Sequence, residues 1–275
     1  MTSTRCAWLL VLCSLLAANA AHALERTVLR IGGTGSAAKT CMNLAEAFQK
    51  TRPDIDIKYV PNLGSGGAIK ALQVGALEIA LSARRLKDNE QPLRSEELGR
   101  TPLALATAHA TASGDISLAM LEQMLDGRLM AWPDASPLRF IMRPESDAET
   151  TYLRAISARI DAAVNAARKR PGLHVATTDQ EAADALEKIP GAIGLTTQAL
   201  VVSEQRKLKL LSLGDKHPSV AALANGQYPH FKPVFAVTQV TPPEAVLAFL
   251  DFVKSRHGAR ILNTNAYLPG PFNVP

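Results

Sequence analysis

The sequence predicts an α/β protein with mixed, mostly parallel sheets, divided into two lobes with a ligand cleft between them. Short apolar runs typical of strands alternate along the chain with segments in which apolar residues recur at helical spacing. Small and hydroxyl residues cluster where two of these strands give way to helices. At 275 residues the chain is also long enough for two lobes that each bury a core.

The N-terminal segment has the pattern of a cleavable export signal. Arg5 precedes an apolar run over residues 7–18, and the small-residue pattern Ala21-His22-Ala23 supplies a cleavage site. We therefore expect residues 1–23 to be a signal peptide. No later stretch of the sequence is long and apolar enough to span a bilayer.

Cysteine content and charge exclude several kinds of protein. Cys6 and Cys13 lie in the predicted signal, which leaves Cys41 without a partner for a disulfide or a cysteine zinc cluster. The formal net charge of +5 fits an anionic ligand, and it fits an ordinary solvated surface equally well. The basic run at 168–170 is interpreted as a solvated helix end, because a chain with 5% aromatic residues offers little stacking surface to nucleic acid.

Strand and helix patterns alternate in the first part of the chain. The apolar spacing predicts strands over residues 28–31, 55–59 and 78–82, with helices over 42–48 and 69–74. The small, apolar stretch 103–112 is predicted to cross into the second lobe.

The same alternation continues in the predicted second lobe. We expect helices over residues 117–125 and 179–187 and one that begins near Asp147, with strands over 138–142, 174–176 and 192–195. A loop-rich stretch, 214–233, precedes a strand at 234–237. Pro242-Pro243 then begins an amphipathic helix, where the missing N–H of proline costs nothing. Residues 24–107 with 232–275 are assigned to lobe 1, and 108–231 to lobe 2.

Two strand-to-helix junctions carry residues suited to anion binding. Thr34-Gly35-Ser36 follows the first predicted strand. Ser65 and Gly66 follow the second, in the glycine-rich stretch just before the helix predicted over residues 69–74. The unpaired N–H groups and the positive dipole end of a helix start both favour an anion. Ser36 and Ser65 are equally interpretable as simple helix N-caps.

Several motifs occur in an order and spacing that resemble one family. They are residues 31–36 (IGGTGS), 64–70 (GSGGAIK), 126–128 (DGR) with Trp132, 143–150, 190–194 (PGAIG), Tyr228-Pro229, Lys232-Pro233, 249–255 with Gly258, and 266–269 (AYLP). Over nearly the whole mature chain, this pattern is similar to the phosphate-binding proteins of bacterial phosphate ABC transporters. Those proteins belong to the type 2 periplasmic binding protein superfamily.

The resemblance implies two lobes, joined by crossing strands, that close over a dehydrated tetrahedral oxyanion. By matching motifs, it places Thr34, Gly35 and Ser36 in the first phosphate loop, Ser65 and Gly66 in the second, and Arg143 as the binding arginine. An arginine fork suits this role because it forms bidentate, charge-assisted hydrogen bonds.

A periplasmic, monomeric solute-binding protein without a cofactor is therefore expected. It would capture a small anion, phosphate first, for an inner-membrane ABC permease. The alternative is a periplasmic sensor that presents its bound form to a membrane histidine kinase.

Two departures from the family pattern bear on the ligand. The third strand ends in Ser82-Ala83-Arg84, where the family has a serine followed by a proton-accepting aspartate. The segment after the arginine carries Asp147 and Thr150 instead of a Ser-Gly-Thr turn. We expect Ser82, Arg84, Asp147 and Thr150 to contribute to the site. Asp147 would either oppose an anion or replace the missing proton acceptor.

Other interpretations of these residues remain open. Ser146 and Glu149 have the spacing of a capping box. Arg143 could form a surface ion pair instead of binding ligand, and Arg84 could face either the cleft or solvent.

Cys41, one turn into the first helix, is either a small core residue or a soft ligand. A thiolate near a helix start has a lowered pKa and could bind a thiophilic species such as arsenite. This possibility belongs to the sensor alternative.

No enzyme activity is expected. The sequence contains neither a Gly-x-Ser-x-Gly elbow nor a His-Glu-x-x-His motif, and its histidines have no metal-ligand spacing. Asp147 and Glu149 lie two residues apart at a helix start, so the two carboxylates would point to different faces.

Overall fold

The computed structural model describes residues 26–111, 113–214 and 216–272, and their strands form one mixed sheet. Its strand order is β2-β1-β3-β9-β4-β7-β5-β6, and β8 and β10 pair with β4 off this path. The predicted signal peptide lies outside the described residues. Within them, we find no helix that combines the length and the apolar character of a membrane span.

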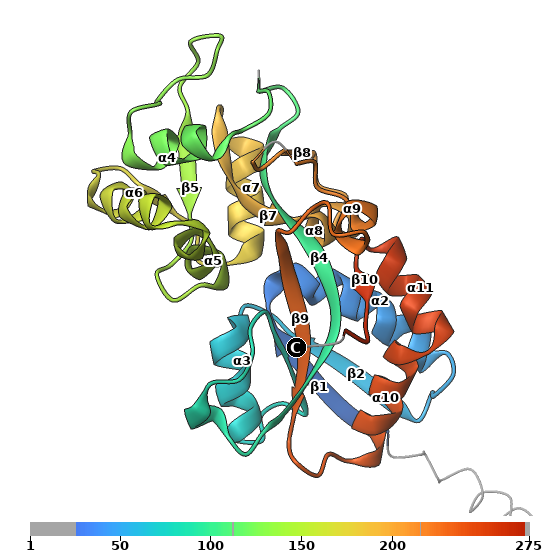
Figure 1. Ribbon diagram of the computed structural model, residues 1–275. Helices are drawn as coiled ribbons and strands as arrows, with labels where there is room; N and C mark the ends of the chain where they lie inside the picture. Colours follow the sequence, from blue (N-terminus) through green and yellow to red (C-terminus); the bar gives the residue numbers. More distant parts are fainter. Residues whose placement is uncertain (1–25, 112, 215, 273–275) are drawn as a thin grey trace, which may run out of the picture.

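Two groups of elements lie at the two ends of this sheet (Figure 1). The group that we call the β1 side consists of β1 (Thr27–Gly33), η1 (Gly35–Ala37), α2 (Ala38–Gln49), β2 (Ile55–Val60), α3 (Gly64–Gln73), β3 (Ile79–Ser82), α10 (Glu244–Lys254), α11 (Arg256–Thr264) and β10 (Leu268–Pro269). The β5 side consists of α4 (Leu118–Asp126), β5 (Arg139–Met142), α5 (Ala148–Ile156), α6 (Ala158–Lys169), β6 (His174–Val175), α7 (Asp179–Lys188) and β7 (Ala192–Thr197).

Two long strands pass between the groups and set the pairing at the centre of the sheet. The remaining elements are η2 (Asp88–Glu90), β4 (Arg94–Ala108), α8 (Gln198–Ser203), β8 (Leu208–Leu211), α9 (Val220–Ala224) and β9 (Phe231–Thr238). β4 and β9 pair antiparallel from Arg94 opposite Thr238 to Pro102 opposite Phe231. Mostly parallel pairing, as predicted, holds for the outer strands and fails at this centre.

Apolar residues at helical spacing give α2 and α10 their buried faces, as the sequence predicts. Leu44 and Phe48 of α2 and Phe249 and Val253 of α10 are all buried in one core on the β1 side. The rings of Phe48 and Phe249 meet edge to face with centroids 5.4 Å apart, which adds to the area that they bury. This packing fixes both helices against the same sheet.

The β5 side has a core of its own. Trp132 packs there with Leu103 and Ile193, as expected for a second lobe, and its indole N–H donates to the carbonyl of Gly191 at 3.0 Å. The boundaries proposed for the lobes, 24–107 with 232–275 and 108–231, stay a prediction.

Several elements were not predicted. The stretch 214–233, expected to be a loop, contains α9 and the start of β9, and the crossing strand β4 begins nine residues before Leu103. α6 and α11 escape the periodicity argument because each carries few large apolar residues. In α6 the large apolar residues are Ile160 and Val164, which stand between alanines. In α11 the contact with α10 is made through the backbone at Gly258.

Gly191→Ala should destabilise the protein more than Gly75→Ala. Both glycines have φ near +73°, but a Cβ at position 191 would lie 1.9 Å from the carbonyl oxygen of Pro137, whereas position 75 has no neighbour within 4 Å. Gly75→Ala is the control: it measures only the cost of placing alanine in the left-handed conformation, which is about 1 to 2 kcal/mol. The clash at 191 should add about 1 to 3 kcal/mol. Urea unfolding measures both, and equal losses would contradict the prediction.

Candidate functional site

A cleft of about 500 Å³ lies between the β1 side and the β5 side. The loops after β1 and β3 and the start of α3 form one wall, and the loops after β5 and β6 form the other. In open α/β sheets, ligands bind outside the carboxyl ends of the strands. The residues that face this cleft include Thr34, Gly35, Ser65, Gly66, Ala83, Arg84, Arg143, Asp147, Asp179, Gln180 and Lys232.

Seven of the ten ligand-binding residues expected from the sequence line this cleft: Thr34, Gly35, Ser65, Gly66, Arg84, Arg143 and Asp147. Ser36, Ser82 and Thr150 do not. All three are buried, and they bond to the backbone or to the side chains of residues that do line it.

Ser82 and Thr150 hold cleft residues in place from behind. The Ser82 hydroxyl donates to the carbonyl of Arg84 at 2.7 Å, and the Thr150 hydroxyl donates to the carbonyl of Arg143 at 3.1 Å. Arg168 donates to the same Arg143 carbonyl at 2.8 Å. The expectation that residues 168–170 form a solvated helix end is therefore wrong for Arg168, which helps to fix the loop after β5.

Neither Ser36 nor Ser65 caps a helix, so the capping alternative is wrong for both. Ser36 lies inside η1, where its hydroxyl lies 3.2 Å from that of Thr34. Ser65 is the second residue of α3, and its Oγ accepts the N–H of Ala83 at 2.9 Å. This bond ties the start of α3 to the end of β3 on one wall of the cleft.

The start of α5 differs from the expected capping box of Ser146 and Glu149. Asp147 is the N-cap, and its Oδ1 accepts the N–H of Glu149 at 2.9 Å. Because the cap is supplied by Asp147, the Glu149 side chain turns inward, where it accepts from Lys232 Nζ at 3.0 Å. Asp147 lines the cleft and Glu149 does not.

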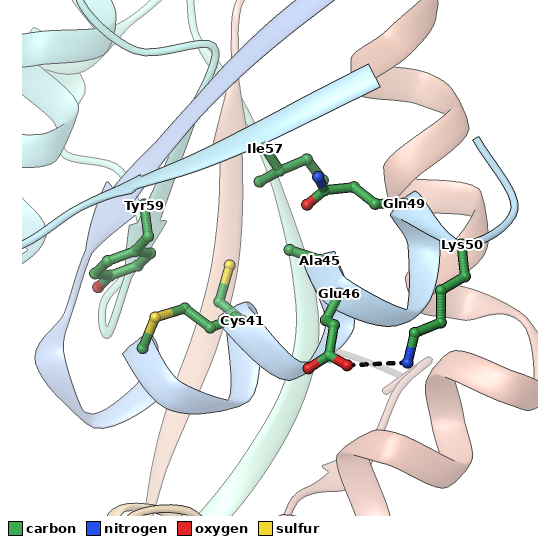
Figure 2. Close-up of a pocket in the computed structure, with 8 residues that line it drawn as sticks. Cys41, Ala45, Glu46, Gln49, Lys50, Ile57 and Tyr59 are labelled. Carbon is green, nitrogen blue, oxygen red and sulfur yellow. Dashed lines mark hydrogen bonds and ion pairs between the residues drawn. The ribbon is translucent and has the colours of Figure 1, made fainter. Parts of the chain in front are cut away.

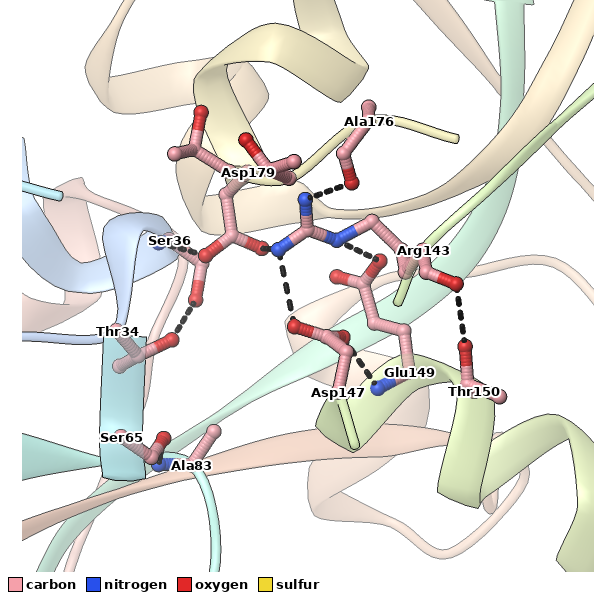
Figure 3. Close-up of polar contacts among 12 residues, drawn as sticks. Thr34, Ser36, Ser65, Ala83, Arg143, Asp147, Glu149, Thr150, Ala176 and Asp179 are labelled. Atoms are coloured by element: carbon pink, nitrogen blue, oxygen red, sulfur yellow. Dashed lines mark hydrogen bonds and ion pairs between the residues drawn. The ribbon is translucent and has the colours of Figure 1, made fainter. Parts of the chain in front are cut away.

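Arg143, Asp147, Glu149, Asp179 and Lys232 form a charged cluster at the base of the cleft, and Figure 3 labels the first four. Lys232 Nζ contacts Asp179 Oδ1 at 2.9 Å as well as Glu149. The Nη2 atom of Arg143 lies 3.0 Å from Asp147 Oδ2 and 3.8 Å from Asp179 Oδ1, and Nε lies 3.7 Å from Glu149 Oε2. Only Asp147 among the five is more than a tenth exposed.

The cluster contains three carboxylates and two cations, and their titration reflects this imbalance. Burial alone would raise the pKa of Asp179, but Lys232 and Arg143 outweigh it and hold that pKa well below its ordinary value. Burial raises the pKa of Glu149 to about 7, because the repulsion by Asp179 and Asp147 offsets the attraction to Lys232 and Arg143. Asp179 is thus a fixed anion, while Glu149 takes up a proton most readily.

The two cleft arginines are held differently. Arg143 is only 6% exposed, so the surface ion pair considered for it is wrong, and its Nη1 donates to the carbonyl of Ala176 at 2.8 Å. Arg84 lines the cleft and also pairs with Glu90 at 2.6 Å. Both guanidinium groups are therefore oriented by fixed partners.

Sequence reasoning missed Asp179 and Lys232 as site residues and assigned Glu149 only to capping. Signals for two of them exist. Asp179 follows a predicted strand at a helix start, the same pattern that singled out Ser36, and Lys232 belongs to one of the motifs that carry the family resemblance.

Cys41 lies away from the cleft, in a separate hollow between α2 and β2 of about 510 Å³ (Figure 2). Tyr59 and the exposed pair Glu46 and Lys50 also line this hollow. Burial raises the pKa of the Cys41 thiol to about 12, which is opposite to the lowered pKa that a soft-ligand role requires. Over the described ranges of the chain, no three His, Cys, Asp or Glu side chains are grouped so that they could hold a metal ion.

Comparison with known proteins identifies the family. The model of the PBP superfamily domain matches residues 18–257. The chain belongs to the PBP superfamily. The matched family is one of binding proteins, in agreement with the sequence.

A curated relative in sequence is named for phosphate. Phosphate-binding protein PstS 2 of Streptococcus pneumoniae is 26% identical over 105 residues, which cover 38% of this chain and 36% of that protein. The match thus spans little more than a third of the relative.

Solved structures extend the likeness over most of the chain. A candidate phosphate ABC transporter substrate-binding protein from Clostridium perfringens, with bound phosphate, has a TM-score of 0.76 at 19% identity, covering 89% of this chain and all of the other. An ABC-type phosphate transport receptor from Vibrio cholerae has a TM-score of 0.64 at 17% identity, covering 88% of this chain and 100% of the receptor.

The effector-binding domain of QuiR in complex with shikimate also matches, with a TM-score of 0.56 at 14% identity, over 82% of this chain and 95% of the domain. At these identities the likeness shows the type 2 periplasmic binding protein fold, which the sequence predicts. It does not identify the ligand, because the matched proteins hold both phosphate and shikimate.

Glu149→Gln should remove a pH-dependent contribution to stability. The pKa of Glu149 rises from 4.5 to about 7 in the folded protein. The contribution of Glu149 to the free energy of unfolding is therefore fully present below pH 4.5 and is lost as the pH rises to 7. The difference is on the order of 3 kcal/mol. Relative to wild type, the variant should gain stability between pH 5 and pH 8 in urea unfolding. Exposed Glu46→Gln is the control, and a constant difference for both variants would contradict the prediction.

Proposed function

We propose that this protein is a solute-binding protein that captures a small oxyanion, phosphate first, in the cleft between its β1 and β5 sides. One observation carries the proposal: the cleft gathers the loop of Thr34 and Gly35, the start of α3 at Ser65 and Gly66, and the guanidinium of Arg143. These groups come from both walls, so closing the cleft brings donors to an anion from two directions.

The chemistry of these groups suits an oxyanion. The first N–H groups of α3 have no partner within the helix, and the helix dipole adds positive potential there. A Cβ at Gly66 would have no neighbour within 4 Å, so the backbone stands open to the cleft. Arg143 adds a charge-assisted donor on the opposite wall.

Asp147 supplies an acceptor for a protonated anion. Ala83 stands where the resembling family has a proton-accepting aspartate, and Asp147 lines the same cleft. Its carboxylate is fixed by the N–H of Glu149 and by Arg143. Asp147 is accordingly the residue that would accept a hydrogen bond from the hydroxyl of a monohydrogen phosphate in this protein.

Delivery to an inner-membrane ABC permease is the role that we favour. Two of the solved structures named above are described as phosphate ABC transport proteins, and the predicted signal peptide would direct this chain to the periplasm. In the sensor alternative, which covers oxyanions and metalloids, only the metalloid part depended on Cys41, whose buried thiol lies outside the cleft. A sensor of oxyanions stays the second candidate.

An anion panel tests the proposal directly. Purified protein is heated with phosphate, sulfate, arsenate, molybdate or a phosphonate, and phosphate at millimolar concentration should raise the melting temperature, because a ligand of the native state stabilises it. A rise in the melting temperature with another anion only would mean that the cleft is specific for that anion and not for phosphate. Ala83, Arg84 and Asp147 would then be the positions to examine. No rise with any anion would contradict the proposed function.

Arg143→Ala should weaken anion binding at least about tenfold, because a lost charge-assisted hydrogen bond costs more than about 1.4 kcal/mol. Arg139→Ala is the matched control, since Arg139 begins the β5 strand that Arg143 follows, and it is exposed and outside the cleft. Titration calorimetry measures both, and circular dichroism checks the fold. Equal affinities of the two folded variants would remove Arg143 from the site.

A further inference from the structure

The carboxylate of Asp179 already makes the contacts that suit an oxyanion. Its Oδ2 accepts the backbone N–H of Ser36 at 3.0 Å, in the loop that the family resemblance assigns to phosphate. Its Oδ1 accepts from Lys232 Nζ at 2.9 Å and faces Arg143 Nη2 at 3.8 Å. Figure 3 shows this carboxylate between Ser36 and the guanidinium of Arg143.

Asp179 reaches this position from the opposite wall of the cleft. It is the first residue of α7 on the β5 side, whereas Ser36 lies in η1 on the β1 side. The neighbouring Gln180 makes a second bond across the cleft, from Nε2 to the carbonyl of Gly35 at 2.9 Å. A Cβ at Gly35 would lie 2.5 Å from Gln180 Oε1 and 3.0 Å from Asp179 Oδ2, so a larger residue there would push both side chains away from η1.

The contact is a buried charge interaction and not a chance surface bond. Asp179 is 7% exposed and Lys232 is 4% exposed, and Lys232 and Arg143 keep Asp179 ionised. With Asp147 and Glu149 nearby, the cations of the cluster are already matched by carboxylates. An arriving anion therefore meets donors that are occupied and a cluster without spare positive charge.

We propose that Asp179 is a built-in competing anion that determines which oxyanions the cleft binds and how tightly. An oxyanion gains the N–H of Ser36 and the full field of Lys232 and Arg143 only by displacing the Asp179 carboxylate. Asp179 thereby weakens the binding of small anions and disfavours dianions most. This inference rests on the proposed function, because it concerns the same cleft and the same class of ligand.

Phosphate titration of four proteins tests this role. They are wild type, Asp179→Ala, Asp179→Asn and the control Asp184→Asn, which removes a carboxylate from the same helix where it pairs with Lys188 and Arg206 outside the cleft. Asp179→Ala should bind phosphate at least tenfold more tightly than wild type. Asp179→Asn should gain less, because its amide oxygen still accepts from Ser36. The control should stay within twofold of wild type.

The possible outcomes separate this inference from the proposed function. If wild type binds phosphate and both folded Asp179 variants bind it equally or more weakly, Asp179 is no competitor and the inference fails while the proposed function stands. If neither wild type nor the variants bind phosphate or any other anion of the panel, the proposed function fails, and the inference fails with it. If only the variants bind phosphate, the competitor role is supported and phosphate is excluded as the ligand of wild type. Should Asp179→Ala not fold, the isosteric Asp179→Asn decides, with a gain of at least threefold expected.

Discussion

The bond between Lys232 and Asp179 ties the crossing strand β9 to the β5 side, and much of the site depends on it. Lys232 stands on the crossing strand β9, while its partners Asp179 and Glu149 come from α7 and α5. Buried charges are costly unless each has a well-placed partner. The positions of both helix starts and of the crossing strand are therefore constrained together, and Arg143 completes the same cluster from the loop after β5.

This constraint shapes the chemistry of the cleft. Loops at the carboxyl ends of β1, β3, β5 and β6 face one another because both outer parts of the sheet are parallel. The resulting walls offer helix-start N–H groups and a guanidinium, which suit an anion, but the base carries one carboxylate more than its cations balance. In the proposed function, capture of an anion would therefore compete with internal neutralisation within one site.

Local patterns predicted a large part of this architecture. The helical spacing in α2 and α10 and the anion motifs at Thr34 and Ser65 each depend on a few consecutive residues, and the structure places them as expected on helices and at the cleft. The capping box of Ser146 and Glu149 failed for a non-local reason. Asp147 takes the cap, and Glu149 is drawn inward by Lys232, which lies 83 residues further along the chain.

The sequence by itself determined the α/β class, the family resemblance and seven of the residues that line the cleft, because periodicity and turn chemistry are properties of neighbouring residues. Only the tertiary structure decided which charges meet. Asp179 lies 143 residues from Ser36 and 53 from Lys232, and no spacing rule connects positions so far apart. It likewise decided that Cys41 is an inert core thiol, because the burial that raises its pKa comes from distant parts of the chain.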